Sequence, residues 1–495
     1  MSPILPTFEG SIYKQMLRAS AWTIVSRWSV RVIGLVNTAI LARLLTPQDF
    51  GIMGMAMLMI GLIEGFLEFG SSMLIIREPN LSREYCDTAW TMQILQHLII
   101  ALIMLAIAPL AAQYFNEQRI VPVIQVLAAS AVMAGMTNVG MVLVRKELDF
   151  AKDFRFIFYN RIFNFFVTVP LALVLLNYWA LIVGHIVSTI ISVFLSYQMH
   201  SYRPRLSLAK AKDFIYFGII MIPVNIARYL VTKVPALVVG RITDTATFGK
   251  FNVVADLSVV ITDEVIGPLG RALFPTYAKL VYDKHKLVEA YLNVLSSISI
   301  ICIPIGFILS ATAEDVILII LGTQWLDAVP ILQWLAIYGA FKTLLRTLIG
   351  NILIITGHER LSALSVWIDL AILLFSTIIG GVFWGVFGVV CGATISIVPE
   401  IFLMMYIVTK GIPVTLTQLI SAIWRSIIAG SLIFIVLIMR PDSLSLALLR
   451  LTVDIGIGFI VYTSALIGLW WLSGCPKGVE YGVIQLIKGR LVAKG

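Results

Sequence analysis

Two short polar stretches decide the fold: LARLLTPQDFG at residues 41–51 and VGRITDTATFG at residues 239–249. Each stretch separates two long apolar runs, and we call each of them a joint. A single offset of 198 residues aligns four pairs without a gap: Arg43 with Arg241, Thr46 with Asp244, Phe50 with Phe248, and Gly51 with Gly249. The same joint in two copies predicts an internal repeat of membrane spans.

The composition indicates a protein whose solvent is lipid. Of the 495 residues, 59% are hydrophobic and 13% are charged, whereas soluble domains carry about 25% charged residues. Runs of about 20 apolar residues recur along the chain, which is the length that crosses a bilayer as a helix. The runs do not alternate polar and apolar residues as membrane β-barrel strands do. We therefore expect an all-α polytopic membrane protein.

We expect about fourteen transmembrane helices. Their approximate positions are residues 21–45, 50–76, 89–113, 121–144, 156–176, 179–199, 214–240, 247–271, 287–311, 328–356, 361–386, 387–409, 416–439 and 446–472. The division near residue 386 and the stretch 312–328, which suits a re-entrant or interfacial loop, are the least distinct features of this pattern.

The basic residues set the expected orientation. With the N-terminus inside, 21 Lys and Arg residues fall in inner joints and 6 in outer joints. Cytoplasmic loops are rich in Lys and Arg, so both termini are predicted to be cytoplasmic and the chain to lie in the inner membrane. The same placement explains the net charge of +9 without a nucleic-acid partner.

The joint at residues 201–213 divides the first twelve spans into two equal sets. We expect an N-terminal lobe at 1–200, this cytoplasmic linker, a C-terminal lobe at 214–410, and a final helix pair with its tail at 411–495. Both copies of the repeat enter the membrane from the same side. Such repeats are related by an axis along the membrane normal, which predicts two six-helix lobes with a pseudo-two-fold relation.

The joints also have a local interpretation. Thr46 is placed as an N-cap, Pro47 at the first helical position and Asp49 at the third, close to a capping box. Asp244 takes the N-cap position in the second copy. The arginine of each joint lies at the end of the preceding helix, where it complements the helix dipole. Each joint is thus a tight outer hairpin, and the alternative is that its arginine also touches a substrate near the outer exit.

Charged residues inside the predicted spans are the candidate functional residues, because a charge within a membrane marks a pathway or a buried pair. The basic set is Arg27, Arg31, Arg228, Lys233, Lys342 and Arg346. The principal acids are Glu64, Glu68, Asp256 and Asp369. Either these groups pair and hold helices in register, Arg27 or Arg31 with Glu64 or Glu68 for example, or the acids couple an ion and the basic residues line a water-filled cavity.

Spans one and seven are equivalent in the repeat, and each carries an arginine near mid-membrane. This favours a central cavity with Arg31 and Arg228 facing across it. Arginine offers a rigid planar fork of donors that suits phosphate, so the expected ligand is anionic.

Several kinds of chemistry have no support in the sequence. It contains no P-loop and no HExxH zinc motif. The four cysteines form no CxxC pair, which favours small buried side chains over a metal site. No outer joint is long enough for a catalytic domain. We expect no cofactor and no metal, and a transporter rather than an enzyme.

The span count, the same-side repeat and the Arg-x6-Phe-Gly outer hairpin resemble the multidrug/oligosaccharidyl-lipid/polysaccharide flippase superfamily. Within it, residues 41–51 and the pair Ser26-Arg27 are most similar to the polysaccharide exporter branch, the Wzx-type and colanic-acid-exporter-like proteins. The resemblance implies a V-shaped pair of lobes that open alternately to each side, and undecaprenyl-diphosphate-linked oligosaccharide as substrate. It also implies coupling to H+ or Na+ or the membrane potential, with polysaccharide polymerase and glycosyltransferases as neighbours.

Two other functions remain open from the sequence. An ion-coupled drug or cation antiporter of the same superfamily requires unpaired acids in the cavity. A membrane-bound polysaccharide polymerase or transferase predicts turnover of a purified sugar donor. The basic mid-membrane residues favour the flippase over both.

Overall fold

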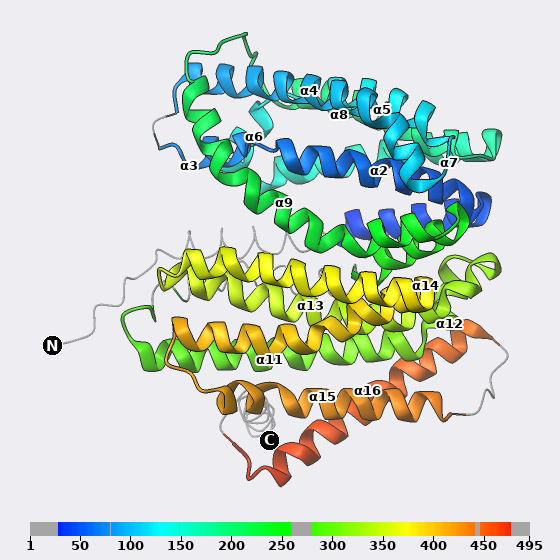
Figure 1. Ribbon diagram of the computed structural model, residues 1–495, viewed down its shortest axis with the longest axis vertical. Helices are drawn as coiled ribbons and strands as arrows, with labels where there is room; N and C mark the ends of the chain where they lie inside the picture. Colours follow the sequence, from blue (N-terminus) through cyan, green and yellow to red (C-terminus); the bar gives the residue numbers. More distant parts are fainter. Residues whose placement is uncertain are drawn as a thin grey trace, which may run out of the picture. The chain divides into compact units, whose positions relative to one another are not determined.

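The computed structural model of the protein describes residues 28–79, 81–147, 149–259, 277, 280–440 and 446–476. Within these ranges the chain is helical, without a β-strand. It divides into two compact units, Met1–Tyr229 and Leu230–Gly495 (Figure 1). The division falls inside one long helix, whereas the sequence places the lobe boundary at the preceding linker. The predicted domain limits stay predictions.

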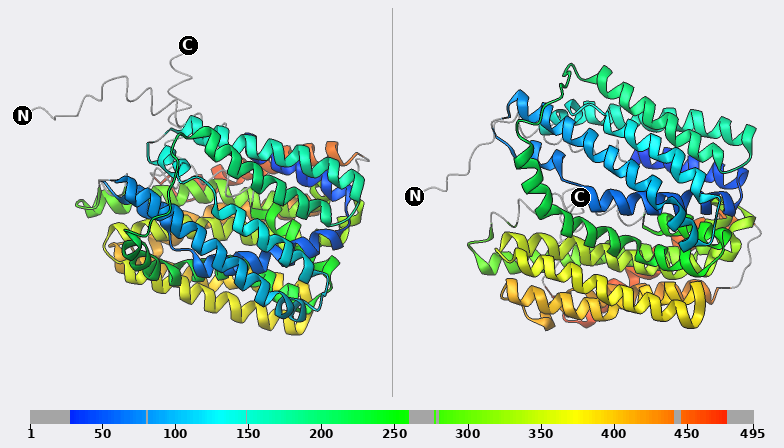
Figure 2. Two further views of the ribbon diagram at one scale, coloured as in Figure 1. Left: turned by 90° about the horizontal axis from the view of Figure 1, so that it is seen from above. Right: turned by 45° about the horizontal axis from the view of Figure 1, so that its top comes forward.

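The first unit is a set of helices that run alongside one another (Figure 2). A helix at 28–44 comes first. It is followed by α2 (Pro47–Leu67), α3 (Ser71–Arg77), α4 (Arg83–Phe115), α5 (Ile120–Gly135), α6 (Gly140–Lys146), α7 (Phe150–Leu175), α8 (Trp179–Met199) and the start of α9 (Ala211–Ile242). Helix α4 packs on α5 and α7 packs on α8, and contacts of α5 with α8 join the two pairs.

Two of the predicted spans are broken. The span expected at 50–76 consists of α2 and α3, with Gly70 in the left-handed region between them at φ 65°. The span expected at 121–144 consists of α5 and α6, which are bent by 60° at a short break. Glycine adopts a positive φ at little cost, so Gly70 permits the first break.

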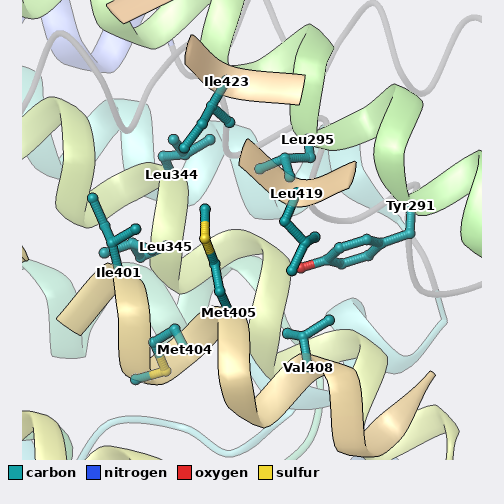
Figure 3. Close-up of a pocket in the computed structure, with 10 residues that line it drawn as sticks. All are labelled: Tyr291, Leu295, Leu344, Leu345, Ile401, Met404, Met405, Val408, Leu419 and Ile423. Carbon is teal, nitrogen blue, oxygen red and sulfur yellow. The ribbon is translucent and has the colours of Figure 1, made fainter. Parts of the chain in front are cut away.

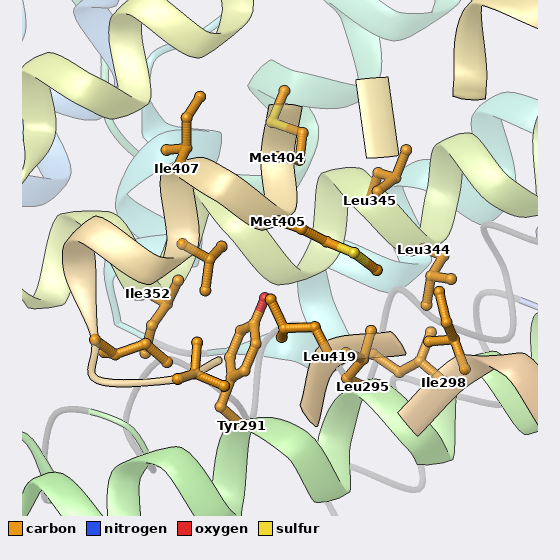
Figure 4. Close-up of a cluster of buried hydrophobic side chains, with 14 of the residues drawn as sticks. Tyr291, Leu295, Ile298, Leu344, Leu345, Ile352, Met404, Met405, Ile407 and Leu419 are labelled. Carbon is orange, nitrogen blue, oxygen red and sulfur yellow. The ribbon is translucent and has the colours of Figure 1, made fainter. Parts of the chain in front are cut away.

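The second unit continues from α9 into a helix at 245–259. Its further elements are α11 (Lys284–Ala311), α12 (Ala313–Ile320), the 3-10 helix η1 (Thr323–Ala328), α13 (Val329–Ile355), α14 (Glu359–Gly411), α15 (Leu416–Ile438) and α16 (Ala447–Leu472). Its core lies where α11, α13, α14 and α15 meet, as the buried cluster around Tyr291, Leu344 and Met405 shows (Figure 4). Helix α16 packs on α15.

Helix α14 is two helices joined by a turn of two residues. Trp384 and Gly385 have non-helical backbone angles, and Gly385 has φ 59°. The halves pack closely because a methyl group on Gly380 would overlap the carbonyl oxygen of Gly388. Small residues allow such approach of membrane helices. The division predicted near residue 386 is confirmed.

The described residues contain 10 helices long and apolar enough to cross a membrane, or 11 if the bent pair α5–α6 counts as one span. This supports a multi-pass membrane protein. Helix α14 counts once in that number although it holds two predicted spans. The predicted spans at 21–45 and 247–271 extend beyond the described residues. The number fourteen and the two-lobe symmetry stay predictions.

The joint at 41–51 has the predicted cap. The Asp49 amide lies 3.4 Å from Thr46 Oγ1, and the Thr46 amide donates to Asp49 Oδ2 at 2.9 Å, which completes a capping box with Pro47 in the first turn. Asp49 is buried and also accepts a bond from the Tyr178 amide at 2.9 Å. It therefore ties the hairpin to the α7–α8 connection.

The second joint has the same design without the added tie. Asp244 Oδ2 accepts bonds from the amides of Ala246 and Thr247 at 3.1 and 3.2 Å, which confirms it as an N-cap. Burial alone would raise the pKa of Asp244, but hydrogen bonds from Thr247 and from these amides outweigh it and lower the pKa. Asp244 is exposed, so the second cap acts locally.

Candidate functional site

A lysine and two carboxylates form a cluster inside the second unit. Lys342 lies on α13, Asp369 on the first half of α14 and Glu400 on the second half. Lys342 Nζ donates to Asp369 Oδ1 at 2.5 Å and to Glu400 Oε2 at 2.9 Å. The residues Asp369 and Glu400 are 8% and 2% exposed. Three segments of a membrane bundle are thus joined by one ammonium group.

The cluster has an unequal charge count. One ammonium carries a single positive charge, whereas the two ionised carboxylates carry two negative charges. Buried charges are stable when they are paired and hydrogen-bonded. The arrangement is therefore suited to hold one further positive charge, either as a proton on a carboxylate or as a bound monovalent cation. The sequence pattern placed Lys342 among the basic residues that line a cavity. Its contacts with Asp369 and Glu400 show instead that it pairs with acids inside the bundle.

The first unit carries ionisable groups that are exposed, unlike the buried cluster of the second unit. Glu64 and Glu68 lie one turn apart at the end of α2, and Arg228 lies on α9; all three are exposed. Among the described residues, no ion pair joins either glutamate to a base. A charge exposed to hydrocarbon costs several kcal/mol, so a surface that carries three such residues in membrane-length helices must meet water.

Close packing of α9 on α2 positions these groups. A methyl group on Gly61 would lie 2.8 Å from the Tyr229 hydroxyl oxygen, so the ring would have to shift if this position carried a side chain. Tyr229 Oη donates to the Leu58 carbonyl at 2.6 Å, and Asn225 Nδ2 donates to the Glu68 carbonyl at 3.3 Å. These contacts hold α9, which carries Arg228 next to Tyr229, against α2.

The other predicted residues are placed as follows. Arg27 lies outside the described residues, and nothing is described of the Arg346 side chain on α13. Arg31 and Lys233 are half-buried, Asp256 is exposed, Arg43 and Arg241 are exposed at the joints, and Gly51 and Gly249 are buried. The structure brings Lys342 and Asp369 together.

Glu400 is the functional candidate that the sequence-based site lacks. It lies 31 positions after Asp369, a spacing that no single helix would place on one face. It reaches the same lysine because α14 reverses direction at Trp384–Gly385. A glutamate within an apolar run beside Pro399 was the available signal.

A small apolar cavity lies in the core of the second unit, lined by side chains of α11, α13, α14 and α15 such as Tyr291, Met405 and Leu419 (Figure 3). Its volume of about 30 Å³ suits a water-sized group. It is too small for a lipid chain. Among the described residues no group of three or more His, Cys, Asp or Glu side chains could hold a metal ion.

The chain is similar to known proteins both in sequence and in fold. The family model described as polysaccharide biosynthesis protein matches residues 40–330. The chain is 23% identical to the lipopolysaccharide biosynthesis protein WzxC of Escherichia coli over 410 residues, which cover 81% of this chain and 82% of that protein. The family-model match includes both joints.

Solved structures share the fold. The lipid II flippase MurJ in an inward closed conformation matches with a TM-score of 0.71 over 90% of this chain and 98% of that chain, at 13% identity. An inward-facing multidrug resistance transporter of the MATE family matches with a TM-score of 0.56 over 78% of this chain and 98% of that chain, at 15% identity. The family model covers more than half of the chain, so the chain belongs to the polysaccharide biosynthesis protein family, and it shares the fold of these flippase and transporter structures.

Proposed function

We propose that the protein moves an undecaprenyl-diphosphate-linked oligosaccharide across the inner membrane by alternating access. The carrying observation is the exposed set Glu64, Glu68 and Arg228 on helices that are long and apolar enough to span a membrane. Such a surface requires a water-filled path. The family and the similarity to lipopolysaccharide biosynthesis protein WzxC support a polysaccharide precursor as the cargo.

Arginine side chains carry the recognition of the substrate in this proposal. A diphosphate needs charge neutralisation inside the membrane, and a guanidinium supplies it with two parallel hydrogen bonds. Arg228 is the exposed candidate. Arg31, Arg27, Lys233 and Arg346 complete the proposed cationic group, and the joint arginines serve the outer hairpins.

The cluster of Lys342, Asp369 and Glu400 couples transport to an ion in this proposal. Its charge count leaves room for one H+ or Na+, and it connects α13 to both halves of α14. Occupancy by the ion neutralises the cluster, whereas release leaves a net negative charge that favours hydration. Fourteen spans, cytoplasmic termini, and a polymerase and glycosyltransferases as partners belong to the same proposal.

Export assays on single variants test the site. We expect Arg228→Ala to lower export about tenfold or more, because a charge-assisted hydrogen bond contributes about 1.5–3 kcal/mol. Arg228→Lys keeps the positive charge but lacks the planar fork of donors. Its export should lie between that of the wild type and that of Arg228→Ala. Arg119→Ala is the matched control, since Arg119 lies in the α4–α5 connection and pairs with Glu117. Wild-type export by both Arg31→Ala and Arg228→Ala, at wild-type protein levels, overturns the site.

One observation favours a second candidate, the drug or cation antiporter. Glu64 and Glu68 are exposed acids without an ion pair among the described residues, and exposed acids in a cavity suit a cationic substrate. An efflux assay with a lipophilic cationic dye separates the two functions. Dye efflux that Glu64→Gln abolishes supports the antiporter, and absence of efflux from a protein active in glycan export supports the flippase.

A further inference from the structure

The segment that joins α8 to α9 is held against α4 and has no regular secondary structure up to a turn at 209–210; we call residues 200–210 the strap. Three of its backbone amides donate to side chains in the first turns of α4: Arg205 N to Asp87 Oδ1 at 2.9 Å, Ser207 N to Thr91 Oγ1 at 2.9 Å, and Lys210 N to Thr88 Oγ1 at 3.3 Å. The strap is therefore an ordered part of the first unit and not a free tether.

Both ends of the strap carry further bonds to α4 and its surroundings. The Tyr202 hydroxyl donates to Asp87 Oδ1, and the Tyr85 hydroxyl of α4 donates to Asp213 Oδ2 in the first turn of α9. The Tyr202 carbonyl accepts a bond from Asn138 Nδ2 at 2.7 Å. These bonds fix the backbone of the strap before any ligand binds. Binding on the side of the strap that faces away from α4 therefore costs little further conformational entropy.

The length of α4 fixes the depth of the strap. The 33 residues of α4 extend about 50 Å, whereas the hydrocarbon core of a bilayer is about 30 Å thick. The first turns carry Arg83, Glu84 and Asp87, and a long apolar stretch follows. The helix therefore projects from the hydrocarbon core mainly at its N-terminal end. All contacts of α4 with the strap lie within about 12 Å of that end. The strap lies at headgroup level.

The outer side of the strap combines apolar and basic side chains. Leu206 and Leu208 are 75% and 56% exposed. Arg205 of the strap and Lys212 in the first turn of α9 are also exposed, and no hydrogen bond or ion pair of their side chains occurs among the described residues. Leucines favour the edge of the hydrocarbon, and cations near them favour anionic headgroups.

We propose that the strap is an interfacial anchor that binds anionic phospholipids of the leaflet on its side of the membrane. Leu206 and Leu208 insert below the headgroups, while Arg205 and Lys212 contact lipid phosphates. The ligand class is any phospholipid with a net negative headgroup. This site is distinct from the transport path, and it holds the end of the first unit at a constant depth.

Depth measurement on the full chain in lipid nanodiscs tests insertion. Cys475→Ser and Cys391→Ser remove the accessible native thiols, and Leu206→Cys receives a nitroxide label. We expect the label to collide more with oxygen and less with a water-soluble nickel complex than a label at Ser201→Cys, an exposed polar position of the same strap. Equal water accessibility at both positions overturns the insertion.

Lipid retention tests the headgroup contacts. Phosphatidylglycerol bound to protein purified from nanodiscs of phosphatidylcholine with phosphatidylglycerol is counted by native mass spectrometry. We expect retention at the strap to fall roughly fivefold for each charge removed in Arg205→Gln and Lys212→Gln. Lys284→Gln, an exposed lysine at the start of α11, is the matched control. Unchanged retention in both strap variants overturns the proposal.

A third arm separates ordinary phospholipid from a transport substrate. Undecaprenyl diphosphate is added to nanodiscs of phosphatidylcholine alone, and the Leu206→Cys label is measured again. Insertion that depends on phosphatidylglycerol and is insensitive to the diphosphate supports the anchor. Insertion that appears only with the diphosphate overturns it and makes the strap part of the substrate path.

Discussion

Two sets of membrane ionisable groups, one in each unit, are held in opposite ways. In the second unit, Lys342 lies between Asp369 and Glu400, and its one ammonium group contacts both buried carboxylates. In the first unit, Glu64, Glu68 and Arg228 are exposed. The sequence signal is the same in both, a charged residue within an apolar run. The difference shows that such a signal marks either a buried joint between helices or a wetted surface, and only packing decides which.

The largest expected effect comes from breaking the paired cluster. Lys342→Met leaves two carboxylates buried without a base, and removal of one partner of a buried pair costs about 3–5 kcal/mol. We expect a marked fall in the midpoint of thermal unfolding in detergent micelles.

The matched control restores neutrality. Lys342→Met combined with Asp369→Asn and Glu400→Gln removes every charge, and it should recover most of the lost stability because no buried charge is left unpaired. A single Lys342→Met variant as stable as the wild type would show that the cluster is open to water like the surface of the first unit.

The next effect compares the two joints. Asp49→Ala removes a cap and also the bond to the Tyr178 amide, whereas Asp244→Ala removes a cap alone. A lost N-cap costs about 1 kcal/mol, and a further buried amide without a partner adds about 1–3 kcal/mol. Thermal unfolding of both variants measures the difference, and equal destabilisation would contradict the tie through Tyr178.

Acid titration gives a smaller effect at the second joint. Hydrogen bonds to Asp244 lower its pKa in the folded protein in spite of burial. A lowered carboxyl pKa stabilises the fold above the unfolded value of about 3.9 and loses that contribution as the pH falls through the folded value. The stability difference between wild type and Asp244→Asn should therefore be constant near neutral pH and shrink below about pH 4. A difference that grows on acidification would reverse the sign.

The smallest stability effect is expected at the exposed acids. Glu64→Gln removes no ion pair among the described residues, and surface substitutions change stability by about 0.5 kcal/mol or less. Unfolding should be unchanged while transport is tested separately. A large loss of stability would place Glu64 with the buried cluster and remove the contrast between the units.

The sequence was sufficient for the features that depend on neighbours along the chain. Thr46, Pro47 and Asp49 specify their cap within four residues, and Asp244 specifies the second. Apolar length identified the membrane helices and indicated the division near residue 386, although this division was among the least distinct features of the pattern.

Features that depend on contacts between distant parts of the chain could not be predicted from the sequence. The contact between Lys342 and Glu400 spans 58 positions and needs the reversal of α14. The break at Gly70 is hidden in an apolar run because a lone glycine does not signal a broken helix. The strap at 200–210 was predicted to be a linker. Its hydrogen bonds go to Thr88 and Thr91 on α4, which are more than a hundred positions away in the sequence, so no local pattern indicated them.

The reversal at the middle of α14 also sets how the second unit meets lipid. Phe383 and Trp384 at the turn are 70% and 71% exposed, and tryptophan is enriched at the membrane–water boundary. The turn has no spare residues that could lengthen when the bilayer thickens. A short turn of this kind leaves tilting of the whole hairpin as one way in which this part of the chain can adjust to a change in bilayer thickness.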